Sequence, residues 1–226
     1  MTRIKFTPKF ALFLFIFPVS NALYFWLTID PVDVSVSLDE SGIIETVQLV
    51  YLAGGSLLFF FAAATLSGAE RMFCVAIAIL CLVFLLRELE IASAGPFTAY
   101  LESKSFRIHE TLLVAGVAIS YMVFRWDLID DVLRFVFSKS AWPFYLAGIL
   151  LSAGAIFDML HGSVPNQIKE EILECSCYLA LLLIAGAISV QQPGVIIRSR
   201  SRDVLMVVLA VTLFAGACWL TAWVHR

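Results

Sequence analysis

Charged residues are scarce in this chain of 226 residues, since 15% are charged and 61% are hydrophobic. A soluble domain has roughly a quarter charged and about half apolar residues. The mean hydropathy of +0.94 is typical of a chain that lies largely within a bilayer. The sequence also has no basic block of the kind that binds nucleic acid, which excludes nucleic acid as a partner.

Paired cysteines are also lacking. The chain has five cysteines, an odd number, and all of them lie in apolar surroundings rather than in loops. They therefore do not form a disulfide framework. Cys175 and Cys177 are two residues apart, so a helix would point them in different directions, and they form neither a redox pair nor a zinc site. We expect all five to be packing residues.

Several catalytic signatures are missing as well. The last apolar run, 204–224, contains no lysine, which a microbial rhodopsin needs for its retinal Schiff base. His225 stands alone, whereas membrane hydrolases of the alkaline ceramidase group carry a paired His-x-x-x-His near the C-terminus. Gly-x-Ser-x-Gly and His-Glu-x-x-His are absent too. The sequence therefore does not indicate any of these families.

Long apolar runs are what the sequence has in abundance. A hydrocarbon core about 30 Å thick is crossed by about 20 helical residues. Seven runs approach this length, and they predict spans at about 10–28, 43–66, 72–91, 108–124, 142–160, 172–190 and 204–224. We predict an all-α integral membrane protein with one polytopic domain, 1–226, built from a bundle of seven transmembrane helices.

The first run allows two interpretations. Ser20-Asn21-Ala22 is similar to a signal-peptidase site, and cleavage there would leave six helices. However, the apolar stretch continues through 23–27, beyond any such cleavage point. We favour an uncleaved first helix.

A short amphipathic helix is predicted between the fourth and fifth spans, at 126–139. Its apolar residues fall on one helical face, and its charged residues fall on the other. The apolar set is Leu128, Ile129, Val132, Leu133 and Val136, and the charged set is Asp127, Asp130, Asp131 and Arg134. This pattern predicts a helix on the cytoplasmic surface of the membrane.

The distribution of Lys and Arg predicts the orientation. With the N-terminus inside, most of the basic residues fall in cytoplasmic segments, as the positive-inside rule requires. These residues are Arg3, Lys5, Lys9, Arg71, Arg125, Arg134, Lys139, Arg198, Arg200 and Arg202. Trp26 at an outer end and Trp126 at an inner end suit anchoring at both interfaces. We therefore expect a multi-pass protein of the cytoplasmic (inner) membrane, with its N-terminus in the cytoplasm and its C-terminus outside.

Under this topology, polar residues gather at the outer ends of five spans. They are Glu45, Gln48, Arg87, Glu88, Glu90, His109, Glu110, Asp158, His161, Glu170, Glu171 and Glu174. A charge at mid-membrane costs about 2.5 to 3.5 kcal/mol on insertion scales and less near the interface, so these groups need water, partners or a metal. The alternative is that these are ordinary charged helix ends, since arginine and glutamate reach the interface there.

Helical spacing suggests roles for some of these residues. Asp158 and His161 are three residues apart, so one helix face presents a carboxylate and an imidazole, a combination that can hold a metal ion. We predict metal ligands at Asp158, His161 and Glu174, catalytic roles for Glu88, Glu90, His109 and Glu174, and a structural ion pair between Arg87 and Glu90. The implied cofactor is a divalent metal ion.

Three functions are consistent with this pattern. The leading hypothesis is an outer-side site that binds a cation or performs metal-assisted hydrolysis of a lipid-type substrate. A second is a non-catalytic sensor, assembly factor or scaffold that binds a partner membrane protein. The third is an ion or metal transporter, which the shortage of polar residues in the inner halves of the spans disfavours. Under all three hypotheses, the chain is embedded in the lipid bilayer.

Overall fold

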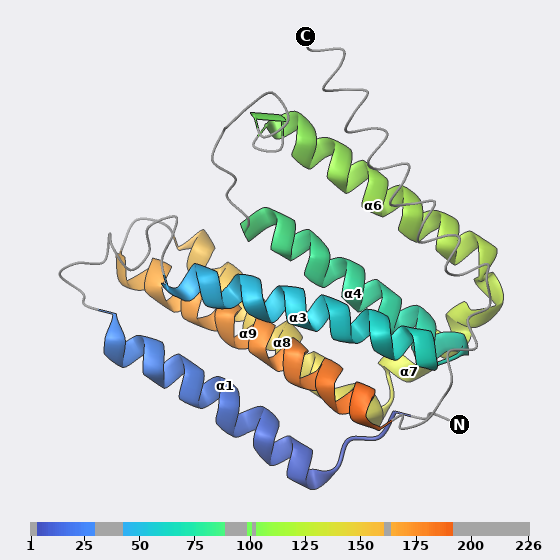
Figure 1. Ribbon diagram of the computed structural model, residues 1–226, viewed down its shortest axis with the longest axis horizontal. Coiled ribbons are helices and arrows are strands. Elements are labelled where there is room, and N and C mark those ends of the chain that lie inside the picture. Colours follow the sequence, from blue (N-terminus) through green and yellow to red (C-terminus); the bar gives the residue numbers. More distant parts are fainter. Residues whose placement is uncertain (1–3, 30–42, 89–98, 101–102, 161–163, 192–226) are drawn as a thin grey trace.

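The computed structural model describes residues 4–29, 43–88, 99–100, 103–160 and 164–191. This part of the chain is helical, and no strand occurs in it. The long helices are α1 (Pro8–Thr28), α3 (Ile43–Thr65), α4 (Gly68–Glu88), α6 (Lys104–Phe124), α8 (Trp142–Met159) and α9 (Val164–Val190). Between α6 and α8 lie two 3-10 turns (Trp126–Leu128 and Lys139–Ala141) and the short helix α7 (Ile129–Val136) (Figure 1). The predicted short helix between the fourth and fifth spans is thus present.

Six helices in the described part are long and apolar enough to cross a membrane: α1, α3, α4, α6, α8 and α9. Their outward-facing side chains are largely apolar, for example Leu27, Leu57 and Ile149. A surface of this kind suits lipid rather than water, which indicates a multi-pass membrane protein. The predicted seventh span, 204–224, lies outside the described residues.

The sixth predicted span differs from the structure at its start. We expected it to begin at about 172, whereas α9 begins at Val164. Glu170, Glu171 and Glu174 therefore lie well within the helix rather than at its N-terminus. The helix includes the charged stretch because groups on neighbouring helices donate to at least two of these carboxylates, Glu171 and Glu174.

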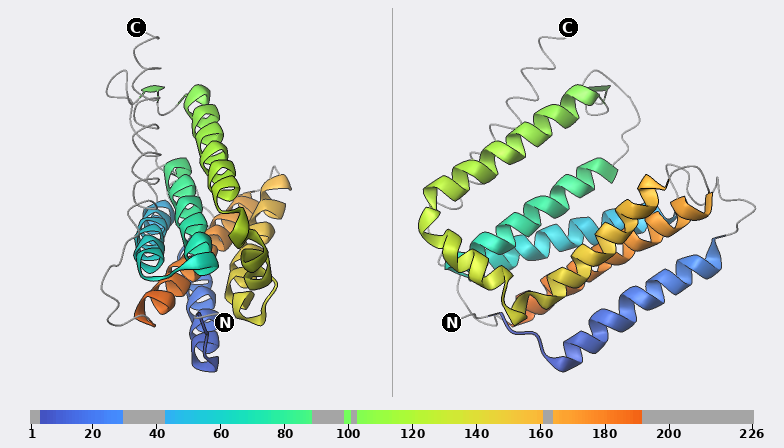
Figure 2. Two further views of the ribbon diagram at one scale, coloured as in Figure 1. Left: turned by 90° about the vertical axis from the view of Figure 1, so that its right-hand side faces the viewer. Right: turned by 180° about the vertical axis from the view of Figure 1, so that it is seen from behind.

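Helix α9 is the central element of the bundle. About 67% of its apolar window is buried, compared with 17% for α1 and 11% for α6. It packs against α1, α3 and α8, while α3 also packs against α4. Figures 1 and 2 show α1 and α6 at opposite edges, with α3, α4, α8 and α9 between them. The most deeply buried helix, α9, thus carries the acidic residues Glu170, Glu171 and Glu174.

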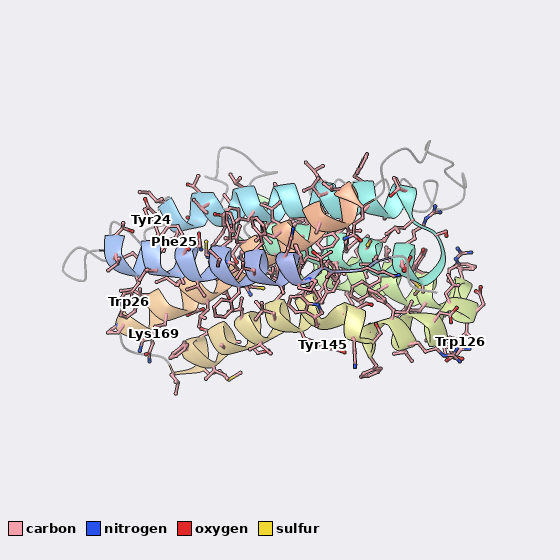
Figure 3. All side chains as sticks on the ribbon, turned by 90° about the horizontal axis from the view of Figure 1, so that it is seen from below. Tyr24, Phe25, Trp26, Trp126, Tyr145 and Lys169 are labelled. Atoms are coloured by element: carbon pink, nitrogen blue, oxygen red, sulfur yellow. The ribbon has the colours of Figure 1, made fainter. Side chains whose placement is uncertain are left out.

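The two ends of the bundle differ in chemistry. At the end we call the charged end, α1 and α4 finish and α3 and α9 begin, and Arg87 and Glu174 meet there. At the opposite end, the segment before α1 crosses to other helices: the Ile4 amide donates to Glu70 Oε1 at 3.2 Å, and the Lys5 amide donates to Gln191 Oε1 at 3.2 Å. Figure 3 shows Trp26 and Lys169 at one end of the molecule and Trp126 at the other.

Helix α7 packs on the start of α4. Phe135 is buried and meets Phe73 in an edge-to-face contact, with ring centroids 5.1 Å apart. Trp126, Leu133 and Phe137 remain exposed on the same short segment. Exposed aromatic and aliphatic side chains next to charged ones are typical of a helix at a membrane surface.

Candidate functional site

The candidate site is a group of polar side chains at the charged end, between α3, α4 and α9. It consists of Gln48 on α3, Arg87 and Glu88 on α4, and Glu171, Glu174 and Tyr178 on α9. The three α9 residues are spaced by three and four positions, so they share one face of the helix. We call this group the acidic cluster.

An ion-paired network joins α4 to α9. Arg87 Nη2 lies 3.2 Å from Glu88 Oε1 and 3.3 Å from Glu174 Oε2. The Arg87 side chain is 49% exposed, whereas the Glu88 and Glu174 side chains are 16% and 9% exposed. The guanidinium therefore reaches inward from the surface to largely buried carboxylates, and this geometry makes the pair more than a surface contact.

The Tyr178 hydroxyl contacts both carboxylates of this network. It is 3.3 Å from Glu88 Oε1 and 3.4 Å from Glu174 Oε2, and the side chain is fully buried. One hydroxyl has a single proton to donate, so it bonds one carboxylate at a time. The two acids thus share one hydroxyl donor and one guanidinium.

Gln48 and Glu171 form the part of the cluster that joins α3 to α9. Gln48 Nε2 donates to Glu171 Oε2 at 2.9 Å and to the Glu171 main-chain oxygen at 3.3 Å. Both partners are acceptors, so the amide nitrogen is the atom that bonds them, and the amide oxygen takes no part in these two bonds. Gln48 is fully buried, and its Oε1 has no hydrogen-bond partner among the described residues.

Carboxyl groups outnumber basic groups within the cluster. Glu171 lies within electrostatic reach of both Glu88 and Arg87, and Glu174 lies within reach of Glu88 and Glu171. Glu88, Glu171 and Glu174 together face the single guanidinium of Arg87. Carboxylates crowded in a partly dehydrated site need further protons or a bound cation.

The predicted site residues divide into three groups. Glu88 and Glu174 are brought together, since both lie within hydrogen-bond distance of the Tyr178 hydroxyl. His109, on α6, meets the Tyr100 hydroxyl through Nδ1 at 2.7 Å rather than the cluster. Asp158 is exposed near the end of α8, on the side of α9 that carries Glu170. Glu90 and His161 lie outside the described residues.

The metal-site and ion-pair predictions therefore stay predictions. In the described part of the chain, no three His, Cys, Asp or Glu side chains are arranged to hold one metal ion. The proposed set of Asp158, His161 and Glu174 includes His161, which is not described. Arg87 is ion-paired with Glu88 and Glu174, and its expected partner Glu90 is not described.

Tyr178 was not foreseen from the sequence. The sequence feature that could have identified Tyr178 is its position four residues after Glu174, on the same face of the helix. A second unforeseen group lies between α1, α3 and α9: the Tyr51 hydroxyl donates to Asn21 Oδ1 at 3.3 Å, and Asn21 Nδ2 donates to Cys175 Sγ at 3.5 Å. These bonds attach α1 to the bundle.

Gly154 on α8 allows close packing behind Glu174. A Cβ at this position would lie 3.2 Å from Glu174 Cγ and 3.6 Å from the Glu170 main-chain oxygen. Gly154→Ala is expected to push Glu174 against Arg87 and Tyr178 and to lower the free energy of unfolding by about 1 kcal/mol, as overpacking does. Thermal unfolding in detergent measures this loss.

Gly148→Ala is the matched control for this substitution. It changes the same residue type on the same helix, at a position where a Cβ would meet nothing within 4 Å. We expect it to be neutral or slightly stabilising, because alanine favours a helix more than glycine does. Equal effects of the two substitutions would show that the contact with Glu174 does not constrain the site.

Comparison of the chain with protein-family models, with curated proteins and with solved structures gave no match. The geometry of the acidic cluster is therefore the basis for a functional proposal.

Proposed function

We propose that the protein is a multi-pass membrane protein that binds a cation at the acidic cluster. The observation that carries this proposal is the charge imbalance, with Glu88, Glu171 and Glu174 facing one guanidinium. A bound cation would offset the repulsion between these carboxylates. It would also stabilise the contacts of α9 with α3 and α4.

The interior of the bundle favours binding over transport. From the cluster toward the opposite end, the buried face of α9 consists largely of apolar side chains, including Leu181, Ile184, Ala185 and Ile188. Ion pathways through membranes are lined by polar groups or water. We therefore propose a site that opens at one end of the described bundle rather than a channel through it.

The hydrolytic version of the site remains a narrower proposal. It requires a divalent metal held by Asp158, His161 and Glu174, with Glu88, Glu90 and His109 assisting water attack on a lipid-type substrate. Metal analysis of the purified protein, with and without His161→Ala, tests it. A stoichiometric metal that is lost in the variant supports this version.

The general proposal is tested by cation-dependent stabilisation. A ligand that binds only the folded state at 100 times its Kd stabilises that state by about 2.7 kcal/mol. We expect a divalent metal or an amine, compared at equal ionic strength, to raise the thermal stability of the purified protein. Glu171→Gln should abolish this increase.

Asp130→Asn provides the matched control, since it removes one exposed negative charge from α7, away from the cluster. This variant should respond to cations as the wild type does. If no cation stabilises the wild type, the proposal fails, and an acidic surface that docks a partner membrane protein becomes the better explanation.

We also propose that the opposite end faces the cytoplasm and that the acidic cluster lies on the outer side. The basis is the positive-inside distribution of Lys and Arg. Single cysteines placed at Ser35 and Pro165 should react with an impermeant thiol reagent in intact cells, whereas cysteines at Asp130 and Arg198 should react only after permeabilisation. Labelling of position 130 from outside would reverse the orientation.

A further inference from the structure

The unused acceptor on Gln48 gives information about the ligand. Gln48 is fully buried, its nitrogen bonds Glu171, and its Oε1 has no donor among the described residues. A buried carbonyl without a partner is costly, and such groups in native proteins commonly face a missing donor or ion. The acidic cluster therefore combines more carboxyl groups than basic groups with an amide oxygen that needs a hydrogen-bond donor.

The spacing of the acidic side chains gives information about the size of the bound cation. In the described part of the chain, the carboxylates are not gathered tightly enough for three of them to hold one metal ion. They are spread instead over α4 and α9, with Arg87 and Tyr178 between Glu88 and Glu174. A cation with several divergent donors matches this arrangement better than a single ion with a short coordination radius.

We propose that the cation bound by the acidic cluster is a primary ammonium group. An ammonium of this kind carries one positive charge and three N–H donors, which suits carboxylates together with an amide oxygen. Glu171 and Gln48 Oε1 accept two of its hydrogen bonds, and Glu88 or Glu174 supplies further negative charge. This inference rests on the proposed function and narrows it to one class of ligand.

The position of the cluster suggests two sources of such an amine. It includes the end of α4, where Arg87 is half exposed, and we place this end of the bundle at the level of the lipid headgroups. Phosphatidylethanolamine presents a primary ammonium at this level, and a small free amine presents the same group from water.

Competition between two lipids tests the proposal. The purified full-length chain is mixed in detergent with equal amounts of dioleoyl phosphatidylethanolamine and dioleoyl phosphatidylcholine, and the retained lipid is identified by native mass spectrometry. The two headgroups carry the same charge, but the quaternary ammonium of phosphatidylcholine has no N–H donor. A charge-assisted hydrogen bond corresponds to a preference of about tenfold for phosphatidylethanolamine.

Two matched variants locate the preference in the structure. Gln48→Leu removes the acceptor and should bring the preference down to about onefold, whereas Gln191→Leu makes the same change at the opposite end and should leave it intact. If Gln48→Leu does not fold, Glu171→Gln takes its place. Added ethanolamine that displaces the lipid identifies the free amine as a ligand, and failure to displace it identifies the headgroup, both of which agree with the proposal.

The outcomes separate this inference from the proposed function. Equal retention of the two lipids by the wild-type protein, with no stabilisation by ethanolamine, overturns the ammonium proposal. If a divalent metal still stabilises the protein in a manner that depends on Glu171, the cation site stands and only its ligand class is wrong. If neither amine nor metal binds, both proposals fail.

Discussion

Replacing Arg87 with alanine is expected to destabilise the protein more than other changes to exposed charges. The substitution leaves Glu88 and Glu174 without the guanidinium that lies 3.2 and 3.3 Å from them. Removing one partner of a buried pair costs about 3 to 5 kcal/mol, and the half-exposed position of Arg87 places the expected loss at about 3 kcal/mol. Unfolding of the purified protein in detergent measures the difference.

A second substitution identifies the more important partner of Arg87. Combining Arg87→Ala with Glu174→Gln or with Glu88→Gln should restore about 1 to 2 kcal/mol, since neighbouring sites are coupled. The larger recovery is expected with Glu174, because its side chain is the more buried of the two. Arg134→Ala on α7 is the control, and at this exposed position it should change stability by less than about 0.5 kcal/mol.

If Arg87→Ala were as stable as the wild type, Arg87 would only be extending to water. The acids of the cluster would then not depend on it for charge compensation, and the charge argument for a cation site would lose its main support.

Two substitutions of Tyr178 should have very different effects. Tyr178→Ala removes a fully buried ring that packs beside Phe84, with ring centroids 5.8 Å apart. The cavity should cost about 3 to 5 kcal/mol, as loss of a buried aromatic side chain does. Tyr178→Phe keeps the ring and removes only the hydroxyl, which should cost about 1.5 kcal/mol because its acceptors are carboxylates.

The comparison separates packing from polar contacts. Phe59→Ala provides a control for the cavity, since Phe59 is fully buried in the apolar core and has no polar group. If Tyr178→Phe were as stable as the wild type, the hydroxyl would not support Glu88 and Glu174. The distances of 3.3 and 3.4 Å would then reflect proximity without a stabilising bond.

The helices could be predicted from the sequence because each apolar run independently meets the length requirement of a bilayer. The start of α9 could not be predicted in this way, because Lys169, Glu170 and Glu171 precede the apolar run, so hydropathy places the start of the span at about 172. Gln48 and Arg87, on other helices, donate to Glu171 and Glu174 and so stabilise these carboxylates within α9. Such tertiary contacts override local composition.

The membership of the site could be predicted only in part, for a geometric reason. Membrane topology predicts how deep a residue lies, but not where it lies around the bundle. Glu88 and Glu174 share a depth and also lie close together across α4 and α9, whereas His109 meets Tyr100 and Asp158 lies within electrostatic reach of Glu170. The rotation of α3 against α9 depends on close packing such as that of Gly54, where a Cβ would lie 3.1 Å from Leu182 Cδ1.

The central position of α9 has a consequence for biogenesis. A ribosome synthesises α1, α3 and α8 before α9, so these helices enter the bilayer before their common packing partner exists. Until α9 arrives, Arg87 lacks Glu174, and Gln48 has no carboxylate to which it can donate. Nascent chains arrested before Val164 should therefore remain associated with the insertion machinery or be degraded, because exposed charged and polar groups at span ends are costly in lipid. Chains arrested after Val190 should instead be released as a compact, protease-resistant bundle.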